Sequence, residues 1–291
     1  MTHILTLIAA RAATNLDDAT IGRVRDAVRG DEVAVLSPGE AVDIPLREAP
    51  SMDVVRAAIG NKPIDAIAVK ARGRRKGLLI ADMDSTVITT ETLDELADFA
   101  GLKERISAIT ARAMNNELNF EEALRERVGM LKGLGVDALE KTWARVALTG
   151  GARELVATMR AHNAMTALVS GGFTFFTARV ADMVGFHVHR ANVLLDDGAA
   201  LTGAVSEPIL GREAKVTALQ ELAAERGIKL RATLAVGDGA NDLAMLAEAG
   251  LGVAFHAKPA VAAAARARVD FCDLRALLFA QGYRAGDIRG D

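Results

Sequence analysis

Short apolar runs separated by amphipathic stretches divide the 291-residue chain into two parts with different patterns. In the first part, up to about residue 70, the order of these runs predicts strand, helix, strand, strand, helix, strand. The strands are expected at 4–9, 33–36, 41–44 and 64–69, and the helices at about 17–28 and 51–59. This order permits a ferredoxin-like α+β sandwich, in which helices cover one antiparallel sheet.

The second part, from residue 77, alternates strands with helices, which predicts an α/β domain with a doubly wound, largely parallel sheet. Strands are expected at 77–81, 164–169, 233–236 and 251–254, with helices from 152, 213 and 242 and a hairpin around 196–198. Residues 91–148 interrupt this alternation, contain no proline and are rich in Ala, Glu, Leu, Arg and Lys. We therefore expect a helical cap there, inserted into the domain at 77–291. The polar tail from Gln281 is expected to be frayed.

Residues 71–76 join the two parts and carry the basic run Arg72-Gly73-Arg74-Arg75-Lys76. The run is short and contains no aromatic residue, so a solvated linker is expected rather than a nucleic-acid-binding patch. The chain is thus predicted to consist of an α+β domain at 1–70, this linker, and the α/β domain at 77–291.

Composition narrows the class of protein. With 51% hydrophobic and 25% charged residues, the chain is typical of soluble globular proteins, and a net charge of −3 gives no reason to expect a nucleic-acid partner. No uninterrupted apolar run approaches the ~20 residues that span a bilayer. The run at 4–10 lacks the basic segment that precedes a signal-peptide core. The single cysteine, Cys272, suits a reducing cytosol. We predict a cytoplasmic protein without a membrane partner.

Two carboxylates, Asp82 and Asp84, come directly after the apolar run at 77–81. Side chains at i and i+2 of an extended chain point the same way, so both could face one polar pocket. An Asp-x-Asp tripeptide by itself is most often part of a turn. Two crowded acids do not easily both ionise, so one tends to keep a proton unless a cation intervenes. This pair would suit a nucleophile beside a general acid, or a hard metal ion.

Three further polar groups stand beside later elements of this domain. Ser170-Gly171-Gly172 follows 164–169, Lys215 lies near the start of the helix from 213, and Gly237-Asp238-Gly239-Ala240-Asn241-Asp242 follows 233–236. In open α/β sheets, ligands gather beyond the carboxyl ends of the strands. We therefore expect these groups to meet Asp82 and Asp84 at one edge of the sheet.

The chemistry of this set favours a metal ion and a phosphoryl group. Hard oxygen ligands select Mg²⁺ over softer metals, and Asp82 and Asp238 are the best direct ligands. Asp84 would contribute either its carboxylate or its backbone carbonyl. Lys215 and Ser170 suit the non-bridging oxygens of a phosphoryl group. The glycines after Ser170 would also offer backbone N–H groups at the N-terminus of a helix, which is a ready anion site.

These motifs, in this order, resemble those of the haloacid-dehalogenase superfamily. They are Asp82-Met83-Asp84-Ser85-Thr86, Ser170-Gly171-Gly172, Lys215 and Gly237-Asp238-Gly239-Ala240-Asn241-Asp242. More narrowly, residues 77–282 resemble the phosphatases of that superfamily that act on phosphoserine. The resemblance implies that Asp82 is the nucleophile and Asp84 the general acid/base. It adds Asn241 as a phosphate- or network-binding residue and Asp242 as a residue that orients Mg²⁺ from its outer shell.

The resemblance also extends to two charged residues of the expected cap. Glu91 and Arg127 match the substrate-recognition positions of those phosphatases, although isolated charges in a helical insert would usually be solvated. A carboxylate such as Glu91 can accept from the ammonium of phosphoserine, and Arg127 can bind its carboxylate bidentately.

The resemblance therefore implies Mg²⁺-dependent hydrolysis of O-phospho-L-serine to L-serine and phosphate, the last step of L-serine biosynthesis, through an aspartyl-phosphate. Ser170, Gly171, Lys215 and Mg²⁺ would offset the charge on the phosphoryl oxygens. Two alternatives stay open. One is a phosphatase or phosphotransferase of the same superfamily that acts on another small phosphate ester. The other is a serine-sensing protein whose phosphatase-like domain has lost its activity.

The domain at 1–70 resembles an ACT-type regulatory domain in the order of its elements. ACT ligand sites typically use a glycine in the first strand–helix loop, whereas residues 10–17 contain none. Serine binding by this domain, or a homodimer formed through it, is a hypothesis.

Overall fold

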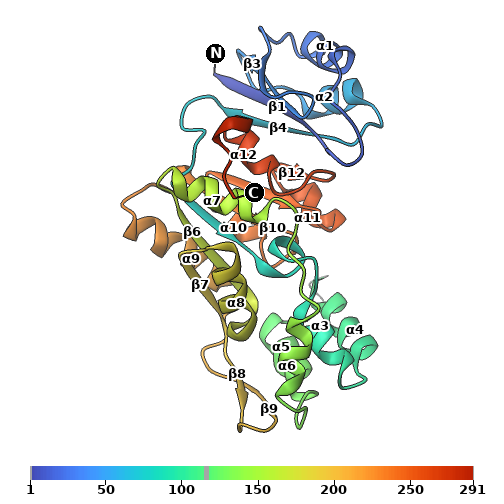
Figure 1. The fold of residues 1–291 in the computed structure, drawn as a ribbon, viewed down its shortest axis with the longest axis vertical. Helices are drawn as coiled ribbons and strands as arrows, with labels where there is room; N and C mark the ends of the chain where they lie inside the picture. The colour runs from blue at the N-terminus through green and yellow to red at the C-terminus, as the bar shows by residue number, and fades with distance from the viewer. Residues whose placement is uncertain (1, 115–117, 291) are drawn as a thin grey trace.

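The computed structural model describes residues 2–114 and 118–290. Within them, the first 70 residues form an antiparallel sheet of strand order β2-β3-β1-β4, with two helices on one face (Figure 1). Its elements are β1 (His3–Ala9), α1 (Asp18–Ala27), β2 (Ala34–Ser37), β3 (Ala41–Leu46), α2 (Met52–Ile59) and β4 (Ile64–Lys70). Leu5 and Leu7 of β1 pack against Val24 and Val55 of the helices, because alternate residues of a strand face the same side. The predicted ferredoxin-like α+β arrangement is confirmed.

The second part of the chain is built on a parallel sheet that has six strands in the described residues, in the order β12-β11-β10-β5-β6-β7. The strands are β5 (Leu78–Ala81), β6 (Met165–Phe173), β7 (Val188–Asn192), β10 (Thr233–Gly237), β11 (Leu251–Phe255) and β12 (Ala267–Val269). The first of these in the chain, β5, lies inside the sheet, between β10 and β6. The predicted doubly wound, parallel α/β sheet is therefore confirmed.

Helices cover both faces of this sheet. They are α7 (Ala152–Ala161), α8 (Thr174–Val184) and α12 (Ala276–Ala280) on one face, and α9 (Arg212–Glu225), α10 (Leu243–Glu248) and α11 (Pro259–Ala264) on the other. Adjacent residues of β5 show the alternation: Leu79 packs with the first group and Ile80 with the second. Both faces are thus closed to water, as an all-parallel sheet requires.

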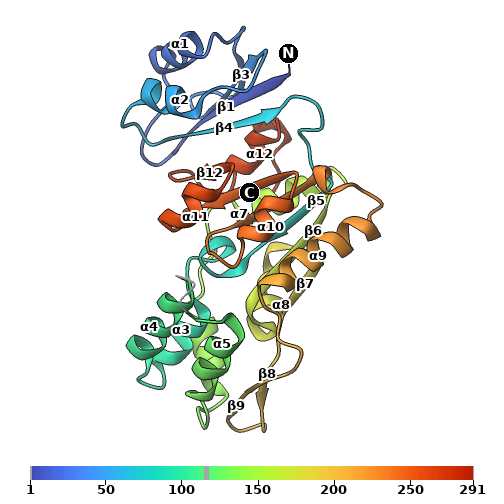
Figure 2. The same cartoon turned by 180° about the vertical axis from the view of Figure 1, so that it is seen from behind.

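The predicted helical cap is present between β5 and α7. It contains α3 (Thr92–Asp98), α4 (Lys103–Met114), α5 (Phe120–Gly129) and α6 (Asp137–Trp143). The chain enters and leaves the cap side by side, since Thr89 N–H donates to the Ala147 carbonyl and Thr149 N–H to the Val87 carbonyl. The hairpin of β8 (Leu194–Asp196) and β9 (Leu201–Val205) extends from the sheet domain to the cap, where Leu201 exchanges backbone hydrogen bonds with the loop after α5. Figure 2 shows the hairpin beside the cap helices.

The segment at 71–76 is not the solvated linker that its composition predicts, because Arg74 is largely buried. Its guanidinium pairs with Asp43 of β3, and it also donates to Thr6 Oγ1 at 2.7 Å and to the carbonyls of Phe279 and Ala280. The sequence could not reveal this, because the partners lie far from Arg74 in the chain. Arg74 thus ties the N-terminal sheet to the end of α12.

The tail from Gln281 is likewise packed rather than frayed, which corrects the prediction. Gln281 and Tyr283 are each only 1% exposed, and the Gln281 side chain accepts from Lys76 N–H at 3.0 Å. Short 3₁₀ turns lie at Leu230–Ala232 and Ala285–Asp287. In the described ranges, no helix has the length and apolar character needed to cross a membrane.

Candidate active site

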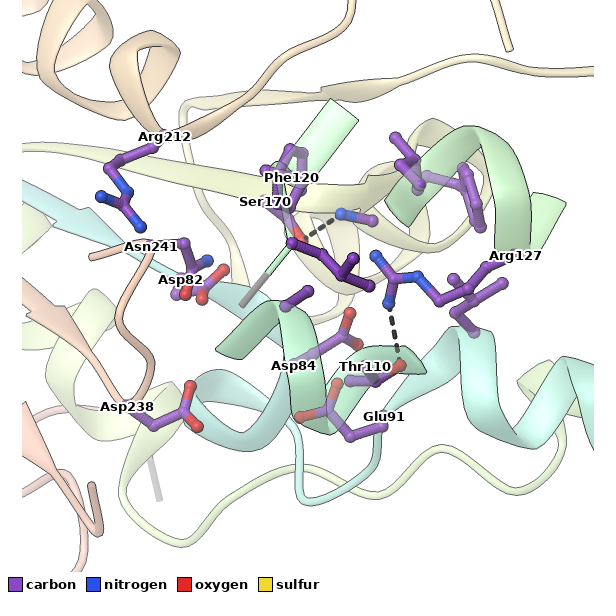
Figure 3. Close-up of a pocket in the computed structure, with 17 residues that line it drawn as sticks. Asp82, Asp84, Glu91, Thr110, Phe120, Arg127, Ser170, Arg212, Asp238 and Asn241 are labelled. Carbon is purple, nitrogen blue, oxygen red and sulfur yellow. Dashed lines mark hydrogen bonds between the residues drawn. The ribbon is translucent and has the colours of Figure 1, made fainter. Parts of the chain in front are cut away.

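The parallel arrangement of β5, β6 and β10 brings the predicted groups to one edge of the sheet. Asp82 follows β5, and its N–H continues the ladder by donating to the Val236 carbonyl of β10 at 3.0 Å. Asp238 follows β10, and Ser170 lies in β6 on the other side of β5. All three line one pocket beneath the cap (Figure 3).

A buried ion-pair network stands behind Asp82. Lys215 Nζ lies 2.8 Å from Asp82 Oδ2 and 2.6 Å from Asp242 Oδ1, and Gly239 N–H donates to Asp242 Oδ2 at 3.1 Å. Burial alone lowers the pKa of Lys215, but Asp242 and Asp82 outweigh it, so the pKa is raised. Lys215 therefore stays protonated and holds one oxygen of Asp82 in place.

Three carboxylates of this edge form a group that fits a divalent metal ion. Oxygens of Asp82, Asp238 and Asp242 all lie within 4.8 Å of one another. Burial first, and then Asp82 and Asp242, raise the pKa of Asp238 to about 8. Burial followed by Asp82 raises the pKa of Asp242 to about 7. Such crowding of buried negative charge is what a hard cation relieves. The carboxylate of Asp84 does not belong to this group.

Asp84 sits in the turn Met83–Val87 that follows β5, and its own backbone there is extended, with φ −63° and ψ 137°. The next residue, Ser85, has a φ of 53°, which a non-glycine residue adopts rarely. The Asp84 carboxylate accepts from Thr92 N–H and from Thr92 Oγ1, both at 3.2 Å. Burial, followed by the charges of Glu91 and Asp82, raises its pKa well above the ordinary value. A carboxyl group that keeps its proton in this way is suited to general acid catalysis.

The two cap residues predicted to recognise substrate are buried beside the same pocket. Arg127 is 8% exposed; its Nη1 donates to Thr110 Oγ1 at 2.9 Å and its Nε to the Ala123 carbonyl at 3.0 Å. Glu91 Oε1 accepts from Ser85 Oγ at 2.7 Å, and burial raises the pKa of Glu91. Figure 3 shows both side chains on the cap side of the pocket. An anionic and an ammonium group of one ligand could therefore be recognised there.

Ser170, Gly171 and Asn241 line the same pocket, and Figure 3 shows Ser170 between Asn241 and Arg127. Ser170 Oγ accepts from Gly172 N–H at 2.9 Å. Strand β6 continues through these residues to Phe173, and α8 begins only at Thr174, so the glycines are not at a helix N-terminus as predicted. A Cβ on Gly171 would lie 2.8 Å from the Phe120 ring of the cap, which explains why glycine is needed there.

Asn192, Arg212 and Phe120 are among the residues of the site that were not found from the sequence. Asn192, at the carboxyl end of β7, donates to the Gly171 carbonyl at 2.9 Å and accepts from Leu210 N–H at 2.7 Å. Arg212 lines the pocket one helical turn before Lys215, and Phe120 lines it from the cap. The strand-end position of Asn192 and the i, i+3 spacing of Arg212 were available signals. Phe120 gave none.

Comparison with known proteins agrees with this geometry. The family model described as haloacid dehalogenase-like hydrolase matches residues 79–247. A phosphoserine phosphatase from Haemophilus influenzae is 45% identical over 202 residues, which are 69% of this chain and 64% of that protein. The chain spans 54 to 64% of the lengths of two such curated relatives.

Two solved structures are similar over different parts of the chain. A phospho-aspartyl intermediate analogue of phosphoserine phosphatase has 40% identity and a TM-score of 0.67, covering 70% of this chain and 98% of that one. An unliganded probable phosphoserine phosphatase from Vibrio cholerae has 31% identity and a TM-score of 0.77, covering 97% of this chain and 86% of that one. The second match therefore includes the N-terminal sheet.

Proposed function

Because the chain belongs to the haloacid dehalogenase-like hydrolase family, we propose that it hydrolyses O-phospho-L-serine to L-serine and phosphate, the last step of L-serine biosynthesis. One observation carries the proposal. The same pocket presents Asp82 on one side and Arg127 on the other, with Ser170, Asp84 and Glu91 between them (Figure 3). A phosphate, an ammonium and a carboxylate can thus be bound at once. The relatives named phosphoserine phosphatase support this substrate.

Asp82 is the nucleophile in this proposal. Its carboxylate attacks phosphorus, the bond from phosphorus to the serine oxygen breaks, and an aspartyl-phosphate forms. Lys215 and Met83 N–H, each 2.8 Å from a carboxylate oxygen, orient Asp82 for the attack. A solved neighbour described as a phospho-aspartyl intermediate analogue supports this step.

Asp84 moves the proton. Its raised pKa lets it give a proton to the departing serine oxygen, so serine leaves as an alcohol. The resulting carboxylate then accepts a proton from the water that attacks the aspartyl-phosphate, which releases phosphate and restores both aspartates. Thr92 is hydrogen-bonded to both carboxylate oxygens of Asp84 and positions this carboxyl group for both proton transfers.

The cap residues select the substrate. Arg127 binds the serine carboxylate and Glu91 the ammonium, while Ser170, Gly171, Lys215 and Asn241 bind the phosphoryl oxygens. Phe120 packs against Gly171 and keeps bulk water from that end of the pocket.

Mg²⁺ is the proposed metal ion. Asp82 and Asp238, with the backbone carbonyl of Asp84, would hold it, and Asp242 would orient the site through Lys215. When bound, the ion offsets negative charge on the carboxylates and on the phosphoryl group.

Phosphate release from a panel of phospho-amino acids, sugar phosphates and nucleotides, with and without Mg²⁺, tests the proposal. We expect phosphoserine to be preferred, and the Asp82→Asn variant to lose turnover and the phosphoenzyme while staying folded. Asp182→Asn, an exposed position on α8, is the matched control. Preference for another ester would favour the wider phosphatase or phosphotransferase alternative. Serine binding without hydrolysis of any ester would favour the sensor.

Two further proposals concern the whole protein. We propose that it acts in the cytoplasm, and that any homodimer forms through the ACT-like domain at 1–70. Sedimentation of the full chain with and without L-serine would test whether that domain links serine binding to dimer formation.

A further inference from the structure

Arg212 is a pocket residue that none of the motifs contains. It is the first residue of α9, half-buried, and it lines the pocket together with Asp82, Asn241 and Arg127. Figure 3 shows its guanidinium beside Asn241, on the Asp82 side of the pocket and across from Arg127. The two arginines therefore face the opposite ends of any ligand in the pocket.

We propose that Arg212 is a phosphate-binding residue that donates to non-bridging oxygens of the phosphoryl group. The site would then bind phosphate through Arg212 as well as through Lys215. This deepens the proposed function and rests on it for the identity of the substrate. Arg212 would act on the phosphate end, while Arg127 acts on the amino-acid end.

The fold holds Arg212 against the phosphate end through Asn192. This side chain, 2% exposed, donates to the Gly171 carbonyl and accepts from Leu210 N–H, so it ties the segment before α9 to Gly171 of β6. The helix then carries Arg212 and Lys215 on neighbouring positions of one side, three residues apart. Arg212 is therefore placed by two anchored elements and not by a free loop.

The charge balance of this end explains what a second cation would do. Lys215 already pairs with Asp82 at 2.8 Å and with Asp242 at 2.6 Å, so these two carboxylates neutralise much of its positive charge. A phosphoryl group brings further negative charge to a site that holds the carboxylates of Asp82, Asp238 and Asp242. A guanidinium on the pocket wall lowers the repulsion between the phosphoryl group and these carboxylates. Its two parallel N–H groups can donate to two phosphoryl oxygens at once.

The half-buried position of Arg212 adds a consequence for the product. Lys215 is 2% exposed and lies behind Asp82, whereas Arg212 is reachable from solvent. Inorganic phosphate that enters or leaves the pocket would meet Arg212 before Lys215. Arg212 should therefore control the affinity for free phosphate as well as for phosphoserine.

Calorimetric titration with inorganic phosphate in the presence of Mg²⁺ tests this. Arg212→Gln should weaken phosphate binding about ten- to hundredfold, the effect of losing hydrogen bonds to a charged group. Arg212→Lys keeps the positive charge but not the two parallel N–H donors of a guanidinium. It should therefore bind phosphate more weakly than the unmodified chain and more tightly than Arg212→Gln. Arg231→Gln, an exposed arginine before β10, is the matched control and should bind like the unmodified chain.

Unchanged phosphate affinity in Arg212→Gln would overturn the proposal, and so would an unmodified chain that binds no phosphate. If Arg212→Gln does not fold, Arg212→Lys carries the test, with a severalfold weakening expected and unchanged affinity counting against the proposal. Binding needs no turnover, so the outcome is separate from the hydrolysis assay. Arg212-dependent phosphate binding in a chain that does not hydrolyse phosphoserine would refute the substrate and leave the role of Arg212 standing.

Discussion

Under the proposed function, Arg127 selects which phosphate ester is hydrolysed. It is buried on the cap side of the pocket, across from Asp82, and its guanidinium donates to Thr110 and to the Ala123 carbonyl (Figure 3). Arg127→Ala should raise KM for phosphoserine about ten- to hundredfold, because a charged hydrogen-bond donor is lost. The rate on a simple aryl phosphate, which has no carboxylate, should change much less.

Arg125, exposed on the same helix and paired with Glu207, provides the control for this experiment. Arg125→Ala should leave both substrates nearly unaffected, since exposed ion pairs contribute little. Equal losses on both substrates in Arg127→Ala would show that Arg127 is structural.

From the pKa of Asp238 we predict how the free energy of unfolding depends on pH when no metal ion is bound. An aspartate in the unfolded chain ionises near pH ~3.9, whereas burial, Asp82 and Asp242 raise the pKa of Asp238 to about 8 in the folded protein. Between these values the folded state holds a proton that the unfolded state has lost. The stabilisation is therefore complete below the lower value and is lost as the pH rises toward 8.

Urea unfolding in EDTA, at pH 5 and pH 8, checks this sign. The unmodified chain should unfold at lower urea at pH 8, and Asp238→Asn should show a smaller pH effect. Added Mg²⁺ should restore stability mainly at pH 8, where the carboxylates are free to bind it. A metal-free protein that becomes more stable toward pH 8 would contradict the assignment.

The residues whose place at the pocket was predicted correctly are those marked by a local pattern. Asp82 and Asp238 directly follow strands, Asp84 lies two residues after Asp82, and a strand end is readable from an apolar run. Arg74 was misjudged and Asn192 was missed because their partners lie far away in the chain, so no local pattern records them. The burial of Glu91 and Arg127 was likewise not readable from the pattern of the cap; only the family resemblance pointed to them.

The contact between the cap helix α5 and strand β6 determines how tightly the pocket closes. Gly171→Ala would place a Cβ 2.8 Å from the Phe120 ring, nearer than packed atoms normally come. We expect at least about a tenfold fall in kcat/KM, because the cap would be held away from the phosphate end. Gly171→Ala combined with Phe120→Leu should recover part of this loss in a steady-state assay.

Gly129→Ala in the same cap helix is the control, since a Cβ there meets nothing within 4 Å. It should leave kcat/KM unchanged. A double variant no better than Gly171→Ala would show that Phe120 is not the group that clashes.

At the level of elements, the sequence predicted what is long or strongly patterned. The strands β5, β6 and β10 are continuous apolar runs, and α7 and α9 are long enough to show a helical period. The elements α11, β12 and α12, of three to six residues, were missed because such lengths carry no period. The end of β6 was placed four residues early, since Ser170-Gly171-Gly172 has the composition of a turn although it continues the strand.

The molecule as a whole depends on contacts between its N-terminal sheet and the α/β domain. Asp65 of β4 is 1% exposed and accepts the N–H groups of Asp270, Phe271 and Cys272. On another strand, Asp43 pairs with Arg74, whose side chain is only 11% exposed. A buried N–H group or charge without a partner destabilises the folded state. We therefore expect each part of the chain to be less stable without the other.

Arg74→Ala should therefore lower the free energy of unfolding by about 3–5 kcal/mol, because it leaves the buried Asp43 without its cation. Chemical denaturation of the full chain measures this. Arg72→Ala, exposed in the same segment, should have almost no effect. Combining Arg74→Met with Asp43→Leu should recover much of the loss, since no unpaired charge remains. If Arg74→Ala lowers the free energy of unfolding by less than 1 kcal/mol, water must solvate the Asp43 carboxylate in place of Arg74.

The interior position of β5 also has a consequence for synthesis on the ribosome. Strand β5, which precedes the proposed nucleophile Asp82, is made first in its sheet, yet its neighbours come later, β6 after the whole cap and β10 after α9. Until then the nascent chain presents an apolar strand with two unpaired edges, a form prone to misassembly. Pairings so distant in sequence also form slowly. Folding of the cap, whose two ends lie side by side, would bring β5 and β6 together before β10 completes the site.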